Sequence, residues 1–136
     1  MRPPEAVKKE LVRQSLAKAE EDMKASETLL AAEPPLLYPT CFHAQQTVEK
    51  CLKAVLTWHQ VEFPKTHVIE ELLDLVGRAD PDLSSSLKDA AALTPYGVDG
   101  RYPGDAPEPD LDETRQAVKL ARKVRDAVAN RLKHIR

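Results

Sequence analysis

The stretch CFHAQQTVEKCLK, from Cys41 to Lys53, carries two patterns along one predicted helix. Apolar side chains recur at steps of three and four residues, which is the spacing of a buried helical face. They are Cys41, Ala44, Val48, Cys51, Val55 and Trp58. Hydrogen-bonding side chains keep the same step on another face, and they are His43, Gln46, Lys50 and Lys53. The first pattern predicts a helix inside a core. The second predicts a surface for a nucleotide, an RNA backbone or the charged groups of a partner.

The segments on either side of this helix also show helical periodicity. A first helix is predicted from Pro4 to Ala32, because apolar and small residues alternate steps of four and three along it. The proline-rich stretch 34–39 is expected to end that helix and to form an extended connection. Thr40 is then the expected N-cap of the second helix, which continues to about Gln60.

Three more helical segments follow. Thr66 is the expected N-cap of a third helix that ends at Gly77, and a shorter segment runs from Asp80-Pro81 to Thr94-Pro95. Asp110 is the expected N-cap of the last helix. Glu113 stands three residues later, so the two residues form a variant of the capping box. Residues 95–109 form the one long irregular stretch, and loops of this length are usually functional or disordered.

These segments together predict the fold class, since no strand alternation or internal repeat is present. We expect an all-α fold, an up-and-down antiparallel bundle of four main helices plus one short helix. The chain of 136 residues is long enough for one core without disulfides or metals, so we expect a single domain over residues 1–136.

Composition excludes few function classes. The net charge of −2 is too small to indicate nucleic-acid binding by itself. Six acids lie between residues 99 and 113, and seven bases lie between 119 and 136. This asymmetry fits either the dipole of the last helix or a basic surface that meets an acidic partner. No transmembrane span or signal peptide is predicted. Cys41 and Cys51 lie roughly 15 Å apart along one helix, so we expect free thiols and a cytoplasmic location.

The sequence lacks the common catalytic and phosphate-binding motifs. HExxH, HxxxH, CxxC, GxxxxGK and GxGxxG are all absent, so no metal site and no cofactor are expected. For the polar face of the second helix, the alternative is a solvated surface with a Glu49–Lys53 pair at i,i+4. In the long loop, Arg101 and Tyr102 form either a recognition pair for phosphate and base, or a simple anchor of the loop.

Three segments resemble one known family. They are HAQQTVEKCLKA (His43–Ala54), PKTHVIEELL (Pro64–Leu73) and GRYPG (Gly100–Gly104), and their order and spacing are similar to those of the HEPN domain family. The resemblance implies a bundle of four long helices plus a short one, often paired into a homodimer. It also implies one of two functions. Some members are endoribonuclease toxins with an Arg-x(4–6)-His motif, and others bind nucleotides or serve as partner subunits of minimal nucleotidyltransferases.

The ribonuclease motif can be checked directly. Before His134 the required positions hold Ala127, Val128 and Ala129, and no other histidine has an arginine at that spacing. We therefore expect no catalytic residue and a non-catalytic module that binds a nucleotide or a nucleotidyltransferase. The alternatives are an atypical endoribonuclease acting on RNA, or a structural adaptor whose basic last helix binds an acidic protein. The expected binding residues are His43, Gln46, Glu49, Lys50, Lys53, Arg101 and Tyr102.

Overall fold

The computed structural model describes residues 4–97 and 108–135. In chain order the elements are α1 Glu5–Ala31, α2 Leu37–Trp58, α3 Ile69–Ala79, α4 Pro81–Ser86, the 3-10 helix η1 Lys88–Gly97, α5 Leu111–Arg131 and the 3-10 helix η2 Lys133–Ile135. No strand occurs in these two described ranges, and the predicted all-α class is confirmed.

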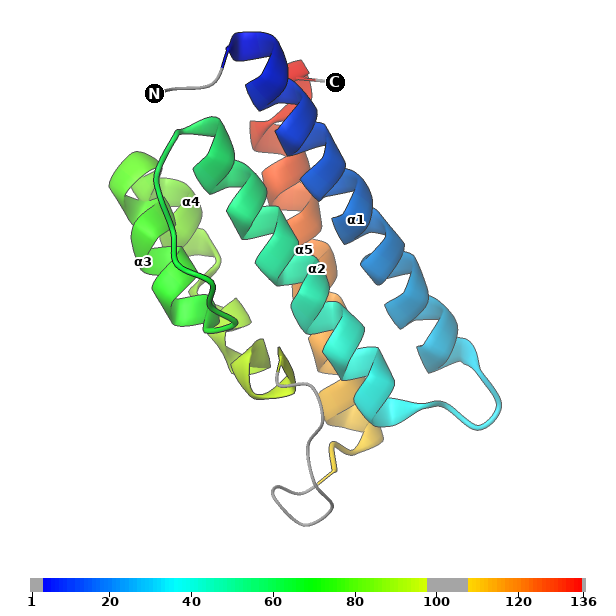
Figure 1. Cartoon of the computed structure of the whole chain (residues 1–136). Helices are drawn as coiled ribbons and strands as arrows, with labels where there is room; N and C mark the ends of the chain where they lie inside the picture. Colours follow the sequence, from blue (N-terminus) through cyan, green and yellow to red (C-terminus); the bar gives the residue numbers. More distant parts are fainter. Residues whose placement is uncertain (1–3, 98–107, 136) are drawn as a thin grey trace.

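The central element of the bundle is α2 (Figure 1). On one side α1 packs along it in the opposite direction, and α5 packs against both of these helices. On the other side lie α3, α4 and η1. The connection 59–68 turns back along α2 and brings His67 beside Glu49. As a result α3 runs in the same direction as α2, so the helix directions do not alternate strictly along the chain (Figure 1).

The start of α2 differs from the prediction. The helix begins at Leu37, and Pro39 lies in its first turn, where a missing backbone N–H removes no hydrogen bond. Thr40 is therefore not the N-cap. It is buried inside the helix, and its hydroxyl donates to the carbonyl of Leu36 at 2.7 Å. The carbonyl of Thr40 accepts a buried hydrogen bond from Ser26 at 2.9 Å, which joins the end of α1 to α2.

Of the later helix boundaries, the start of α5 is predicted correctly and two helix ends are not. Asp110 is confirmed as the N-cap of α5, because its side chain accepts from the backbone N–H of Glu113 at 2.7 Å. Gly77 does not end α3, which continues to Ala79. Thr94-Pro95 does not end the following segment either, because η1 continues as a 3-10 helix to Gly97.

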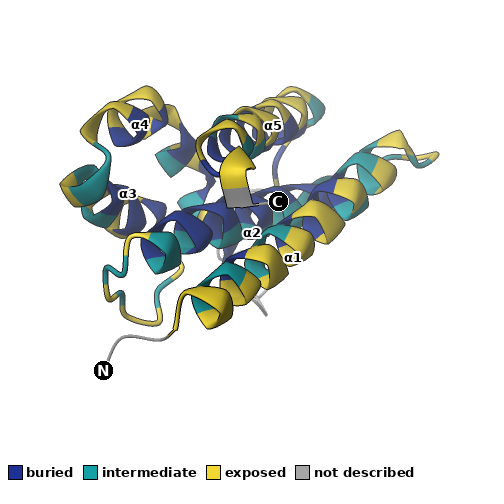
Figure 2. Cartoon of the chain, turned by 90° about the horizontal axis from the view of Figure 1, so that it is seen from above, coloured by how far each residue is buried: buried dark blue, intermediate teal, exposed yellow. Residues whose placement is uncertain are grey.

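The buried face predicted for α2 is the middle of the core. Five of its six apolar residues are buried, and Trp58 is partly buried against the same core. Seen from above, the buried ribbon of α2 lies between the other helices, whose exposed faces point outward (Figure 2). The largest fully buried side chains are Met23, Leu52, Leu56, Ile69, Leu72, Leu87, Leu93 and Leu132. Both cysteines are free and buried, as expected, and burial raises the pKa of the Cys51 thiol to about 12.

Trp58 joins three elements at one end of the bundle. The ammonium of Lys8, in the first turns of α1, lies 4.0 Å from the centre of the indole ring. The ring of His134, in η2, meets the same indole edge-on with 5.2 Å between centroids. Such cation–π and edge-to-face contacts favour one arrangement of the three segments.

Four of the six basic residues of α5 pair with acids of the same chain. The pairs are Arg122–Glu27, Lys123–Asp89, Arg125–Glu20, Arg125–Asp126 and Arg131–Asp80. Most of these partners lie on α1 or on the α3–η1 side, so the ion pairs connect α5 to its neighbours. Among the described helices, none is long and apolar enough to cross a lipid bilayer.

Candidate functional site

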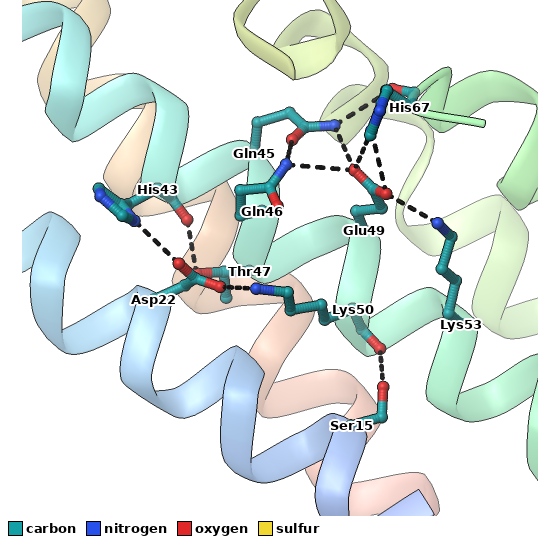
Figure 3. A network of polar contacts seen from close by, with 10 residues as sticks. All are labelled: Ser15, Asp22, His43, Gln45, Gln46, Thr47, Glu49, Lys50, Lys53 and His67. Carbon is teal, nitrogen blue, oxygen red and sulfur yellow. Dashed lines mark hydrogen bonds and ion pairs between the residues drawn. The ribbon is translucent and has the colours of Figure 1, made fainter. Parts of the chain in front are cut away.

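Polar side chains of α2 form two groups, in which Gln45 and Glu49 are buried and the others are partly exposed (Figure 3). Each group is organised by one carboxylate of low exposure. We call the first the Asp22 cluster, which consists of Asp22, His43 and Lys50. We call the second the Glu49 cluster, which consists of Glu49, Lys53, His67, Gln45 and Gln46.

The Asp22 cluster connects α1 to α2. Nδ1 of His43 lies 2.8 Å from one carboxylate oxygen of Asp22, and the ammonium of Lys50 donates to the other. An ionised carboxylate only accepts hydrogen bonds, so Nδ1 of His43 carries the hydrogen. The side chain of Asp22 is 12% exposed, whereas those of His43 and Lys50 are 33% and 31% exposed. The carboxylate is thus the inner group, and the cationic and imidazole groups face outward.

The Glu49 cluster connects α2 to the segment that precedes α3. The ammonium of Lys53 donates to Glu49 at 2.7 Å, and Nδ1 of His67 lies 3.0 Å from the other carboxylate oxygen. The amides of Gln45 and Gln46 donate to the same carboxylate at 3.1 and 3.3 Å. Burial alone would raise the pKa of Glu49, but hydrogen bonds from Lys53, His67 and Gln45 outweigh it and lower the pKa. Glu49 is therefore ionised at neutral pH.

Gln45 fixes the position of the second cluster. Its side chain is fully buried, and its amide also donates to the backbone carbonyl of His67 at 3.1 Å. Gly97, the last residue of η1, lies so close that a Cβ built there would be 2.6 Å from the Gln45 amide nitrogen. The backbone of η1 at Gly97 therefore covers this side of the Glu49 cluster. This contact requires a glycine for close approach.

The structure brings together five of the seven residues expected at the site: His43, Gln46, Glu49, Lys50 and Lys53. The expected i,i+4 pair of Glu49 and Lys53 is formed. The other two, Arg101 and Tyr102, lie outside the described residues. Sequence reasoning missed Asp22, Gln45 and His67 as members of the site. Asp22 gave no signal, because it is the last of three consecutive acids beside the apolar seam of α1, and nothing in the sequence distinguishes it from the other two. His67 belongs to the Pro-x-Thr-His segment quoted for the family resemblance.

The arrangement can bind an anion or a hydrogen-bonding ligand. A lysine ammonium has three N–H donors, and the carboxylate uses one of them, so each lysine is held in place with donors still available. In the part of the chain that the structure describes, no group of three or more His, Cys, Asp or Glu side chains is placed to hold a metal ion.

Comparison with known proteins identifies the family. A family model described as the HEPN domain matches residues 12–132. The chain belongs to the HEPN domain family. Its fold is similar to the crystal structure of ST0689, described as an archaeal HEPN homologue, with a TM-score of 0.69 and 20% identity over 89% of this chain and 97% of that one. The crystal structure of TT1696 from Thermus thermophilus is also similar, with a TM-score of 0.67 and 26% identity over 88% of this chain and 96% of that one. No curated protein matches this HEPN chain.

Proposed function

We propose that this HEPN protein is a non-catalytic cytoplasmic module that binds a nucleotide on the outward side of α2. It does so as a homodimer, or as the substrate-binding partner subunit of a minimal nucleotidyltransferase. The observation that carries the proposal is that two carboxylates of low exposure hold Lys50 and Lys53 on the same half-exposed side of one helix. The two buried free thiols agree with a reducing compartment.

Each outward residue has a role under this proposal. Lys50 and Lys53 bind phosphate oxygens as point charges, and Asp22 and Glu49 orient them without entering the ligand contact. His43 and Gln46 donate or accept oriented hydrogen bonds beside them. Because the orienting groups are already in place, the site loses little conformational entropy on binding.

Two observations bear on the alternatives, an endoribonuclease and a structural adaptor. The Arg-x(4–6)-His motif of an endoribonuclease is absent from the sequence. A structural adaptor would need a basic surface on α5, but four of its basic side chains pair with acids of the same chain.

Thermal unfolding with ATP or GTP at about 1 mM tests the proposal. A ligand at 100 times its dissociation constant stabilises the native state by about 2.7 kcal/mol. With an unfolding entropy of about 2.1 cal/mol/K per residue, this raises the melting temperature of a chain of 136 residues by about 9 °C. The double variant Lys50→Gln/Lys53→Gln should lose the shift, because it keeps an amide donor for each carboxylate but removes both charges.

Lys119→Gln is the matched control, because Lys119 is an exposed lysine of α5 outside both clusters. A nucleotide shift that survives in the double variant would exclude this site. If no nucleotide shifts the melting temperature, the partner-subunit form of the proposal is tested instead, by copurification with a nucleotidyltransferase. Cleavage of single-stranded RNA that is lost in His43→Ala would instead establish the endoribonuclease alternative.

A further inference from the structure

The two clusters are built in the same way. In each, one carboxylate is shared between a lysine ammonium and Nδ1 of a histidine: Asp22 between Lys50 and His43, and Glu49 between Lys53 and His67 (Figure 3). Since Nδ1 donates to the carboxylate, the lone pair of each neutral ring is on Nε2. Nε2 lies on the far side of the ring from the carboxylate. Both rings are solvent-accessible, with exposed fractions of 33% for His43 and 63% for His67.

With both rings in the neutral form, the formal charges of the two clusters cancel, because two carboxylates balance two lysine ammonium groups. A phosphate group that binds here therefore adds uncompensated negative charge beside two carboxylates of low exposure. Because Coulomb interactions are strong in such partly desolvated sites, the added charge favours protonation of any nearby group that can take a proton.

The groups that can take up a proton when the phosphate binds are the two histidines. His43 is contacted by Asp22 from α1 and lies on the same side of α2 as Lys50. His67 is contacted by Glu49 of α2, which also holds Lys53. On the α3 side, the nearest carboxylate in sequence is Glu70, which accepts from Thr94 at 2.6 Å. Histidine is the side chain that ordinarily changes charge between pH 5 and 8.

We infer that His43 and His67 both bind the anionic ligand of this site, and that binding is coupled to proton uptake by their Nε2 atoms. The inference rests on the proposed function and adds His67 to the site. Each proton comes from the solvent and converts a neutral ring that accepts at Nε2 into an imidazolium that donates there. With both rings charged, the two clusters carry a net charge of +2 opposite the phosphate groups.

The sign of the pH dependence follows from this coupling. The rings are more often protonated in the complex than in the free protein, so affinity is highest at low pH and falls as the pH rises. By proton linkage, affinity changes by about tenfold per pH unit for each proton taken up. For a site with lysines alone, affinity would follow only the titration of the ligand.

Isothermal titration calorimetry with ADP measures the proton uptake directly. Titrations at pH 7.5 in two phosphate-free buffers with different ionisation enthalpies give the number of protons bound per ADP. The variants are His43→Gln, His67→Gln and the double variant, in which glutamine keeps an N–H donor for each carboxylate. His59→Gln is the matched control, because His59 is an exposed histidine at the end of α2, outside both clusters. Melting curves without ADP confirm that each variant is folded.

The expected result is proton uptake by the wild-type protein and by His59→Gln that falls in each single variant and falls further in the double variant. The titration of ADP itself contributes equally in all of them and cancels in the comparison. Binding with the same proton uptake in the wild type and the double variant would overturn the histidine coupling and leave the proposed function standing. No binding heat at pH 6 or 7.5 would overturn both.

Discussion

The contact between Gly97 and Gln45 predicts an unusual effect of a small substitution. Alanine normally stabilises a helical segment relative to glycine by about 0.5–1 kcal/mol. In Gly97→Ala, however, the new Cβ would lie 2.6 Å from the amide nitrogen and 2.7 Å from the amide carbon of Gln45. That amide has no room to move, because Gln45 is fully buried and bonded to Glu49 and to the carbonyl of His67.

Overpacking of this kind costs about 1–3 kcal/mol. With an unfolding entropy of about 2.1 cal/mol/K per residue, Gly97→Ala should lower the melting temperature by about 3–10 °C. Because Gln45 also holds Glu49, nucleotide affinity should fall in the same variant. Thermal unfolding followed by circular dichroism measures the first effect.

Gly77→Ala is the control, because the same change in α3 places Cβ 3.4 Å from the Ser84 hydroxyl, an ordinary contact. It should leave the melting temperature unchanged or raise it by a few degrees. If Gly97→Ala melts at or above the temperature of Gly77→Ala, the close approach of Gly97 to Gln45 does not require a glycine.

Two further predictions concern ionisable groups. The pKa of Glu49 is lowered in the folded protein, so its contribution to stability is present above its ordinary pKa of 4.5 and is lost as the pH falls below that value. Urea unfolding between pH 7 and 3 should therefore show that the free energy of unfolding falls less steeply with decreasing pH in Glu49→Gln than in the wild type. An equal fall in both proteins would contradict the lowered pKa. Cys41 and Cys51 are buried, and burial raises the pKa of both thiols, that of Cys51 to about 12. A chromogenic thiol reagent at pH 8 should thus label neither cysteine in the native protein and both in guanidinium, and fast native labelling would show that the helices around α2 open readily.

The helices were predictable where a local signal acts alone. The capping of α5 by Asp110 depends only on residues three positions apart, and the buried face of α2 depends only on helical periodicity. Besides the end of α3, which lies two residues beyond Gly77, the errors concern prolines. Pro39 and Pro95 were expected to exclude helix, but the first lies in an opening turn and the second in a 3-10 segment. Both positions tolerate the missing N–H.

The site was predictable only on the helix that carries it. The step of three and four residues places His43, Gln46, Lys50 and Lys53 on one side of α2, as the structure shows. The carboxylate that organises the first group lies 21 residues from His43 along the chain. The pairing of His67 with Glu49 depends on the connection 59–68 turning back along α2. Such long-range pairing is set by tertiary packing, and a single sequence contains no pattern that specifies it.

The contacts of Trp58 provide an optical probe within the native chain. Trp58 is the only tryptophan, so its fluorescence belongs to one known position. Because Lys8 and His134 meet its ring from elements near opposite ends of the chain, its emission should change when either element detaches from α2. Unlabelled protein can therefore show whether the two terminal elements detach together or in succession, and stopped-flow mixing can assign a rate to each event.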